Sequence, residues 1–457
     1  MIVSTALLCL PLLAPGPQVE LDRFLGSWSG AYVRSGSALR VDVRVTRDDE
    51  GRIVAEERIP DWVYYGWLDP VELKTDERGR LTFNSTYGEA FLFDDAEYGE
   101  LFGPAGRWSP EVTLHLKRSL PEPEPAVVEV PVTFESDVRL EGTLVLPEGE
   151  GPFPCLVRIH GRGCSTRGRH RRQGRVFARY GYATFAYDQR GAGKSEGDCG
   201  TRTFDELVRD AEAAYSAALS DPRIAPERIG LIGGSAGAWT AQALTERLID
   251  DEERPDPAFL VTWIGASTSI LQQQLDSGRA IGASLGLTEA QIALVDRQVE
   301  LAGDRTSPPE EIFAALEAIR VQATEEGWLD RMFGDDDFPP SADQLDRIWL
   351  RRHSYDPTAL LSGLSDVPYL GVFGERDDVV PASTNVENLR TLLIAAGNER
   401  FRIEVVPGLP HSTERGNVFR VFPGAAGGLS YFKFDRVEPV FFSSTIEFLR
   451  ELELGGR

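Results

Sequence analysis

The sequence predicts an α/β fold with a mostly parallel sheet and a helical cap insertion, preceded by a small all-β domain. Three observations predict this arrangement. Residues 20–120 contain runs in which apolar and polar side chains alternate, which is the period of a half-buried strand. From Val127 onward, short apolar runs alternate with helical stretches, as in parallel α/β sheets. Residues 229–239 combine an apolar run, a Gly-x-Ser-x-Gly turn and the start of a helix.

The composition is that of a globular protein long enough for two domains. The chain has 457 residues, of which 42% are hydrophobic and 26% are charged. The formal net charge is −24, so no basic stripe is available to displace counterions from a nucleic acid. The same charge disfavours binding to an anionic membrane surface. We therefore expect no nucleic-acid or membrane partner, and the sequence leaves the oligomeric state open.

Residues 1–17 resemble a secretory signal peptide. An apolar run from Ile2 to Leu13 precedes Ala-Pro-Gly, and this run is too short to span a bilayer. No other segment is long and apolar enough to be transmembrane. We expect a secreted or periplasmic protein, with a cytoplasmic location as the alternative.

Three cysteines follow this segment. Cys155 lies in an apolar run and is expected in the core. Cys164 and Cys199 lie in loops that should lie at one edge of the sheet, where an oxidising compartment would allow a disulfide. The alternative is two unrelated reduced thiols. No Cys-x-x-Cys or His/Cys cluster indicates a metal site.

The N-terminal domain is expected to span residues 18–120 as a β barrel or sandwich. Strand-like alternation occurs at 38–45, 80–87 and 112–118, with hairpin turns at 48–51 and 76–79. Several aromatic side chains could line a binding face or belong to the core, namely Trp28, Trp62, Tyr64, Tyr65 and Trp67. A Pro/Glu-rich stretch at 121–126 is expected to be the linker to the second domain.

The second domain is expected to span residues 127–457. The runs at 127–134 and 138–146 predict an opening antiparallel hairpin. The later strands are expected at 155–159, 183–187, 229–232, 259–264, 369–373 and 401–406. Helical spacing occurs at 204–219, 239–248 and 386–396.

A long stretch without strand candidates interrupts this alternation at about 270–356. Its amphipathic segments predict consecutive helices at 288–301, 309–325 and 341–352. An insertion of this kind would form a cap over the carboxyl edge of the sheet.

The Gly-x-Ser-x-Gly turn predicts a nucleophile elbow with Ser235 at its tip. The turn is so sharp that side chains at positions 233 and 237 would collide, and both are glycine. It would raise the Ser235 hydroxyl above the sheet and direct the Ala236 N–H toward a developing oxyanion. The alternative is a glycine-rich strand-to-helix turn without catalytic function.

A serine nucleophile requires a base and an orienting carboxylate. Of the five histidines, His411 follows the 401–406 run in a loop that would reach the same sheet edge. The loop after the 369–373 run contains Asp377 at Gly-x-x-Asp spacing, with Asp378 as the competing acid. The chain order Ser235, Asp377, His411 is the order expected for a nucleophile elbow.

The second oxyanion donor is expected in the His-Gly-Arg-Gly loop after the 155–159 strand. Glycines allow the backbone to approach a substrate carbonyl, and the Arg162 N–H is the candidate donor. His160 in this position is expected to form structural hydrogen bonds. The nearby arginines could bind a substrate carboxylate or lie solvated on the surface: Arg169, Arg171, Arg172 and Arg175. The Gly-Lys-Ser at 193–195 is not a phosphate-binding loop, because position 188 is aspartate.

Residues 127–450 resemble the α/β-hydrolase superfamily. The resemblance depends on the His-Gly-Arg-Gly loop, the segment Tyr-Asp-Gln-Arg-Gly-Ala-Gly-Lys-Ser at 187–195, the elbow, and the late acid and histidine, in this order. Within the superfamily, the motifs are similar to those of serine esterases and of the dienelactone-hydrolase and prolyl-oligopeptidase-related group. The resemblance implies a Ser-His-Asp enzyme without a cofactor, with Ser235, His411 and Asp377 in these roles.

The leading hypothesis is a serine hydrolase that cleaves carboxylic esters of small or medium size through an acyl-enzyme. A serine peptidase acting on short peptides is the second hypothesis. A non-catalytic binding protein on the same fold is the third. The acyl group and the leaving group are not encoded in any recognisable motif of the cap.

Overall fold

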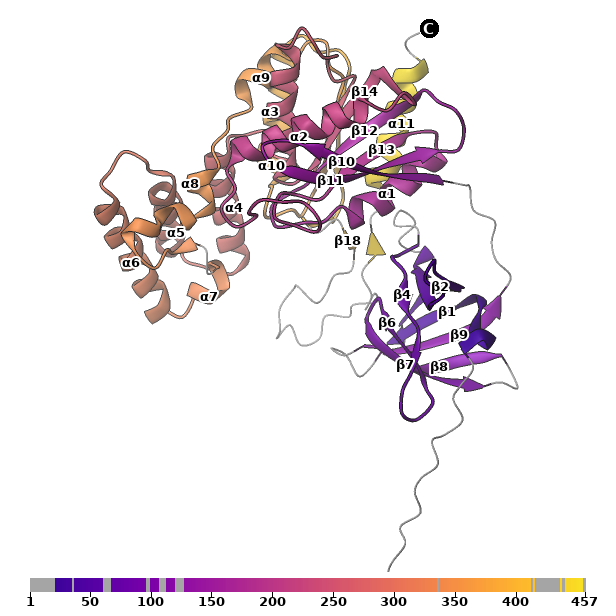
Figure 1. Cartoon of the computed structure of the whole chain (residues 1–457). Helices are drawn as coiled ribbons and strands as arrows, with labels where there is room; N and C mark the ends of the chain where they lie inside the picture. The colour runs from indigo at the N-terminus through magenta and orange to yellow at the C-terminus, as the bar shows by residue number, and fades with distance from the viewer. Residues whose placement is uncertain are drawn as a thin grey trace, which may run out of the picture. The chain divides into compact units, whose positions relative to one another are not determined.

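A computed structural model describes residues 21–34, 37–60, 67–95, 99–106, 112–119, 127–334, 337–411, 414–415, 436–437 and 440–454. The predictions for the signal peptide at 1–17, the linker at 121–126 and the aromatic residues Trp62, Tyr64 and Tyr65 lie outside these residues. The described chain divides into a β unit, which comprises the described residues up to 119 and Arg436, and an α/β unit, which comprises the described residues from 127 to 415 and from 437 onward (Figure 1). Among the described residues, no helix is both long enough and apolar enough to cross a bilayer.

The β unit is a single antiparallel sheet preceded by a short 3₁₀ helix, η1 (Leu21–Phe24). The sheet order is β4-β3-β2-β1-β9-β8-β7-β6-β5, and every described pairing is antiparallel. β4 and β6, near opposite ends of this order, contact each other, so the sheet curls on itself. Its strands are β1 (Gly26–Arg34), β2 (Ser37–Arg47), β3 (Ile53–Arg58), β4 (Val71–Glu72), β5 (Lys74–Thr75), β6 (Leu81–Ser85), β7 (Gly88–Asp95), β8 (Glu100–Pro104) and β9 (Thr113–Ser119).

The alternating strands of the β unit enclose their own apolar core. Trp28 belongs to this core and is 2% exposed, while its indole N–H donates to the Phe24 carbonyl at 2.9 Å. The Trp67 ring is covered by the guanidinium groups of Arg44 and Arg58, at 4.6 and 5.1 Å. The two described aromatic residues of the predicted set are therefore both occupied by intramolecular packing.

The α/β unit is built on an eight-stranded sheet in the order β10-β11-β13-β12-β14-β15-β16-β17. Pairing is parallel from β13 to β17 and antiparallel for β10 with β11 and for β11 with β13, so the sheet is mixed. The strands are β10 (Val127–Glu135), β11 (Arg139–Pro147), β12 (Phe153–Ile159), β13 (Ala183–Tyr187), β14 (Ile224–Gly234), β15 (Leu260–Trp263), β16 (Tyr369–Gly374) and β17 (Phe401–Val406).

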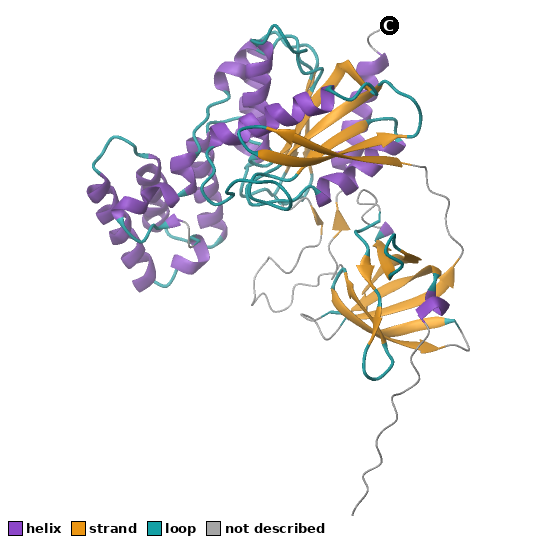
Figure 2. Ribbon diagram, viewed as in Figure 1, coloured by secondary structure: helices purple, strands orange, loops and turns teal. Residues whose placement is uncertain are grey.

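Helices cover both faces of this sheet (Figure 2). α1 (Gly168–Arg179) and α11 (Val440–Leu454) share one face, where the rings of Phe177 and Phe442 pack at 5.4 Å. The other face carries α2 (Phe204–Leu219), α3 (Gly237–Ile249), α9 (Thr358–Gly363) and α10 (Ala382–Ala395), which contact one another in series. α2 begins at a capping box in which Thr203 and Glu206 satisfy each other's backbone N–H groups. Two short strands, β18 (Glu414–Arg415) and β19 (Arg436–Val437), precede α11.

The predicted cap is helical but differs from the prediction in its first and last parts. It contains α4 (Ile270–Ser284), α5 (Glu289–Gly303), α6 (Pro309–Glu325), α7 (Leu329–Met332), η4 (Ala342–Arg347) and α8 (Trp349–Arg352). α4 was not predicted, and its N-cap Ser269 accepts a hydrogen bond from the Gln272 N–H at 3.1 Å. Figure 1 shows α4 and α8 beside the α/β sheet, with α5, α6 and α7 farther from it.

The continuous helix predicted at 341–352 is wrong. Ile348 has extended backbone angles and separates η4 from α8. Leu345, Ile348 and Leu350 are all buried in the cap core. A straight helix would place Ile348 and Leu350 about 200° apart, so only a break allows both to face the same core.

Candidate active site

The strand-to-helix turn between β14 and α3 holds Ser235 in a conformation that L-residues rarely adopt. Its φ is +53°, and its N–H donates to the Trp263 carbonyl on β15 at 2.9 Å. A Cβ at Gly233 would lie 2.3 Å from the Gly237 carbonyl oxygen, and one at Gly237 would lie 2.5 Å from the His160 carbonyl oxygen. Both positions therefore require glycine. The turn leaves Ser235 partly exposed at the carboxyl edge of the sheet.

His411 meets this serine from the loop after β17. The hydroxyl Oγ of Ser235 lies 2.9 Å from Nε2 of His411. The loop that carries the imidazole is fixed to the neighbouring one, because the Arg376 N–H donates to the Leu409 carbonyl at 3.0 Å. The His411 side chain is 22% exposed, so one edge of the ring remains accessible.

Asp377, in the loop after β16, lies on the other side of the same imidazole. Its two carboxylate oxygens lie 3.0 and 2.8 Å from Nδ1 of His411. Oδ1 also accepts the Val379 and Val380 N–H groups at 2.9 and 2.8 Å, which fixes the carboxylate within its turn. The Asp377 side chain is fully buried. The structure thus brings Ser235, His411 and Asp377 together, and it is Asp377 rather than Asp378 that reaches the histidine.

These contacts define what the three side chains can do. A neutral imidazole with its proton on Nδ1 donates to Asp377 and accepts the hydroxyl proton of Ser235 at Nε2. That arrangement can remove the serine proton during attack and return it to a leaving group.

The loop that follows β12 lies against the elbow. A Cβ at Gly161 would be 3.0 Å from the Gly234 carbonyl oxygen and 3.4 Å from the Ser235 Cβ, so the backbone of this loop packs closely against the elbow. Among the described residues, neither the Arg162 N–H nor the Ala236 N–H donates to another protein group. Both predicted donors thus lie on the two segments that border Ser235.

Contacts from distant residues hold the 160–165 loop in place. The Gln189 side chain accepts the Ser165 N–H at 2.8 Å and donates to the Gly161 carbonyl at 3.4 Å. Cys164 is joined to Cys199 in a disulfide. Arg202, 6% exposed, donates to the Cys199 carbonyl at 2.6 Å and to the Gly163 carbonyl. The disulfide is one of the two alternatives that the sequence allows for these cysteines, whereas no sequence motif indicates the roles of Gln189 and Arg202 in holding the loop.

An apolar wall connects the elbow to the cap. One cluster joins Ala236 and Trp239 of the elbow region, Val379 and Val380 beside Asp377, and Trp349 of α8. The Trp239 and Trp349 rings lie 6.5 Å apart, and the Arg162 guanidinium lies 4.7 Å from the Trp349 ring centre. The cap therefore supplies an aromatic surface next to the predicted oxyanion loop.

Among the described residues, His411 is the histidine that hydrogen-bonds to the Ser235 hydroxyl, and the other histidines have other partners. His160 is buried, its Nε2 lies 2.5 Å from the Tyr187 carbonyl oxygen, and its ring stacks on His170 at 4.3 Å. Burial lowers the pKa of His160 to about 4, so the ring is neutral at pH 7. His353 is buried against Trp349 with its pKa also lowered to about 4, and His115 is exposed on β9.

The arginines near the start of α1 are not all available to a ligand. Arg171 and Arg175 both pair with Glu129 on β10, at 2.8 and 2.6 Å. These two guanidinium groups are therefore partly buried in ion pairs, and neither of the two expectations, a substrate contact or a solvated surface position, describes them. The 188–195 segment forms a tight turn in which Asp188 accepts the Lys194 N–H at 3.0 Å.

Part of the α/β unit matches a known protein-family model. Residues 151–268 match the family model described as serine aminopeptidase, S33. The matched segment includes the 160–165 loop and Ser235 but ends before Asp377 and His411. This match confirms the resemblance to the α/β-hydrolase superfamily.

Individual relatives match over shorter segments or with low identity. An uncharacterised peptidase of Bacillus subtilis, YuxL, is 30% identical over 129 residues, which are 24% of this chain and 18% of that protein. The chain thus spans about a fifth of the length of this relative. The esterase Pf2001 of Pyrococcus furiosus is 17% identical, with 72% of this chain and 91% of that chain covered and a TM-score of 0.43. A proline iminopeptidase of Mycobacterium smegmatis is 18% identical, with 72% and 100% covered and a TM-score of 0.41.

Proposed function

We propose that the α/β unit is a serine hydrolase that cleaves carboxylic esters through an acyl-enzyme on Ser235. The observation that supports this most strongly is the hydrogen-bonded series from Ser235 through His411 to Asp377. A serine held at φ +53° by two obligatory glycines is a costly backbone arrangement, and a plain strand-to-helix turn would not need it.

In the proposed reaction, His411 takes the Ser235 proton while Oγ attacks the substrate carbonyl. Asp377 stabilises the imidazolium that forms. The negative charge on the carbonyl oxygen is stabilised by the N–H groups of Ala236 and Arg162. The proton then passes from His411 to the leaving alcohol, and water repeats the sequence to release the acid and restore the Ser235 hydroxyl.

The experiment that tests this proposal measures hydrolysis of p-nitrophenyl acetate and butyrate by the full chain. Ser235→Ala is expected to lower kcat by at least about 10⁴-fold, because no nucleophile remains. Ser284→Ala, on the exposed end of α4, is the control and should retain wild-type kcat. Unchanged turnover in Ser235→Ala would contradict the proposal, and absence of turnover in the wild type would favour a non-catalytic binding protein.

A serine peptidase is the second candidate function. The family model that matches residues 151–268 and the name of the Bacillus relative favour it. Amides need protonation of a poorer leaving group than esters do, and the proposed His411 could supply that proton. A panel of aminoacyl p-nitroanilides assayed beside the esters separates the two: kcat/KM higher for the anilides would replace the ester assignment.

We also infer that the protein works in an oxidising compartment. The Cys164–Cys199 disulfide supports this, because cytosolic thiols are normally kept reduced. Export to the periplasm or medium is expected when the full chain is expressed in a bacterium. Recovery of the mature chain only from the cytosol, with both thiols free to alkylation, would contradict it.

A further inference from the structure

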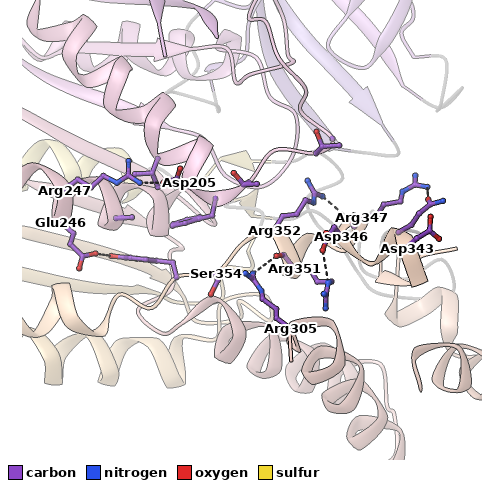
Figure 3. A pocket seen from close by; sticks show the side chains of 18 of the residues that line it. Asp205, Glu246, Arg247, Arg305, Asp343, Asp346, Arg347, Arg351, Arg352 and Ser354 are labelled. Carbon is purple, nitrogen blue, oxygen red and sulfur yellow. Dashed lines mark hydrogen bonds and ion pairs between the residues drawn. The ribbon is translucent and has the colours of Figure 1, made fainter. Parts of the chain in front are cut away.

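A cavity of about 1510 Å³ lies between the cap and the helices α2 and α3. None of Ser235, Asp377 and His411 lines it. Figure 3 shows Arg305, Arg347, Arg351 and Arg352 gathered on the cap side, with Glu246 and the Asp205–Arg247 pair on the side of the core. The volume exceeds that of a typical small-molecule site, so a ligand would bind here with accompanying water.

The cap side of the cavity has a surplus of positive charge. Four guanidinium groups lie there with only two lining carboxylates, Asp343 and Asp346, which leaves a surplus of two positive charges. This is unusual in a chain with a net charge of −24. The opposite wall has the reverse sign, because Asp205, Glu246 and Asp250 outnumber Arg247. An anion entering the cavity is therefore drawn to the cap side.

Most of the cationic groups bond to neutral oxygens. Arg305 donates to the Arg351 carbonyl at 2.6 Å, and Arg347 donates to the Gln344 side-chain oxygen at 3.1 Å. Within the described chain, neither Arg305 nor Arg347 has a carboxylate in ion-pair distance. Arg351 is paired with Asp346 at 3.2 Å, through a carboxylate that is largely exposed. Each guanidinium has five N–H donors, so most of the donors of Arg305 and Arg347 remain available to a ligand.

Hydrogen bonds connect this cavity to the loop beside Ser235. Arg352 donates to the carbonyl of Arg202 at 3.1 Å. Arg202 in turn donates to the Gly163 carbonyl and to the Cys199 carbonyl. A ligand that fixes the Arg352 side chain would also limit the motion of Arg202 and of the 160–165 loop.

We propose that this cavity binds a dianionic small molecule, through a phosphate or two carboxylates held by Arg305, Arg347, Arg351 and Arg352, and that its binding orders the 160–165 loop. Two negative charges match the surplus on the cap side, and paired oxygen atoms match the fork of each guanidinium. Binding itself does not depend on the proposed hydrolase activity.

The test is isothermal titration calorimetry of the full chain with inorganic phosphate and, separately, with succinate, at constant ionic strength set with NaCl. Saturable binding of either probe supports the site, and the ratio of the two affinities shows whether the site prefers a phosphate or a dicarboxylate. Arg305→Ala and Arg347→Ala should each weaken that binding by at least about tenfold, as expected for loss of a charge-assisted contact. Arg297→Ala, an exposed arginine of α5 outside the cavity, should leave it unchanged.

The link to the loop is tested by hydrogen–deuterium exchange of the segment 160–167 with and without the saturating probe. Slower exchange in its presence is expected for the wild type. Two results would overturn the proposal: absence of saturable binding by both probes, or equal affinity in the wild type and in the two arginine variants. Binding without any change in exchange would overturn the link between cavity and loop.

Discussion

The polar and charged side chains at the carboxyl edge of the sheet are paired with one another, whereas several of those in the cavity between the cap and α2 and α3 are not. At the sheet edge, Ser235, His411 and Asp377 satisfy one another, and Asp377 is further fixed by two backbone N–H groups. In the cavity, Arg305 and Arg347 donate hydrogen bonds to neutral oxygens, and no described carboxylate neutralises their positive charges. Three side chains whose hydrogen bonds are satisfied by one another are already placed for a reaction in which they take part directly. Arginines without a carboxylate partner are suited to bind a ligand of opposite charge.

The largest effect is expected from replacing one carboxylate oxygen of Asp377 at the sheet edge. Asp377→Asn preserves the volume but presents an N–H₂ or a neutral oxygen to His411, so the tautomer that accepts the Ser235 proton is lost. We expect kcat for p-nitrophenyl esters to fall roughly 10⁴-fold with KM little changed. Asp378→Asn is the matched control and should stay within a few-fold of the wild type. A comparable loss in both variants would contradict the assignment of Asp377.

The backbone at the elbow offers the next test. Gly237→Ala places a methyl 2.5 Å from the His160 carbonyl oxygen, which cannot move without distorting β12. We expect a loss of more than about 4 kcal/mol in the free energy of unfolding, or no soluble protein. Gly234→Ala is the control, because its nearest neighbour would be the Trp263 carbonyl oxygen at 4.0 Å. Urea denaturation compares the two, and equal stability would show that the close approach at Gly237 is not obligatory.

The disulfide is next to Arg202, the residue that connects the sheet edge to the cavity. Arg202 donates to the carbonyls of Cys199 and of Gly163 in the 160–165 loop, and its own carbonyl accepts a hydrogen bond from Arg352 of the cavity. Cys164→Ser with Cys199→Ser opens a loop closed over a separation of 35 residues. We expect the free energy of unfolding to fall by about 3 kcal/mol. The double variant should also show faster hydrogen exchange at 160–167 than the wild type. An unchanged exchange rate would mean that Arg202 and Gln189 suffice to hold the loop.

The smallest expected effect concerns buried histidines. His353 has its pKa lowered by burial to about 4, whereas an unfolded chain binds that proton near pH 6.5. The unfolded state therefore binds more protons between these values, and stability falls as pH decreases from about 6.5 to about 4. The slope is about 1.4 kcal/mol per pH unit for each such histidine.

His353→Gln should reduce the pH dependence of the free energy of unfolding by the contribution of one histidine, about 1.4 kcal/mol per pH unit. This expectation holds whatever the effect of the substitution on stability at pH 7. The control is His115→Gln, a change at an exposed residue of β9. Urea denaturation followed by tryptophan fluorescence at pH 7, 6 and 5 measures the slopes. Identical slopes in the wild type and in His353→Gln would show that this histidine is not buried in a neutral state.

Much of the framework follows from local sequence patterns. The predicted bounds of the strand at 183–187, the helix at 204–219 and the strand at 401–406 agree with β13, α2 and β17. The two strands are short runs rich in apolar residues, and the helix has apolar residues at helical spacing, so each pattern is visible without reference to the rest of the chain. The Gly-x-Ser-x-Gly pattern also predicts glycine at both positions of the turn, although only Gly233 is required by a neighbour within the turn, whereas Gly237 is required by the distant His160 carbonyl.

The features that sequence analysis missed depend on contacts between distant residues. The break at Ile348 follows from a shared cap core that no local period reveals. Arg202 acts on Gly163, 39 positions away, and resembles any surface arginine in sequence. The pairing of Arg171 and Arg175 with Glu129 spans more than 40 positions. No short motif marks such partners.

In the proposed reaction, Ser235 is the residue that becomes acylated. The most direct measurement is peptide mass spectrometry of the full chain after reaction with a fluorophosphonate probe. We expect a single adduct on Ser235, no adduct at this position in Ser235→Ala, and slow labelling in His411→Ala because the proton acceptor is gone. An adduct on a different serine, or none on a protein that hydrolyses esters, would contradict it.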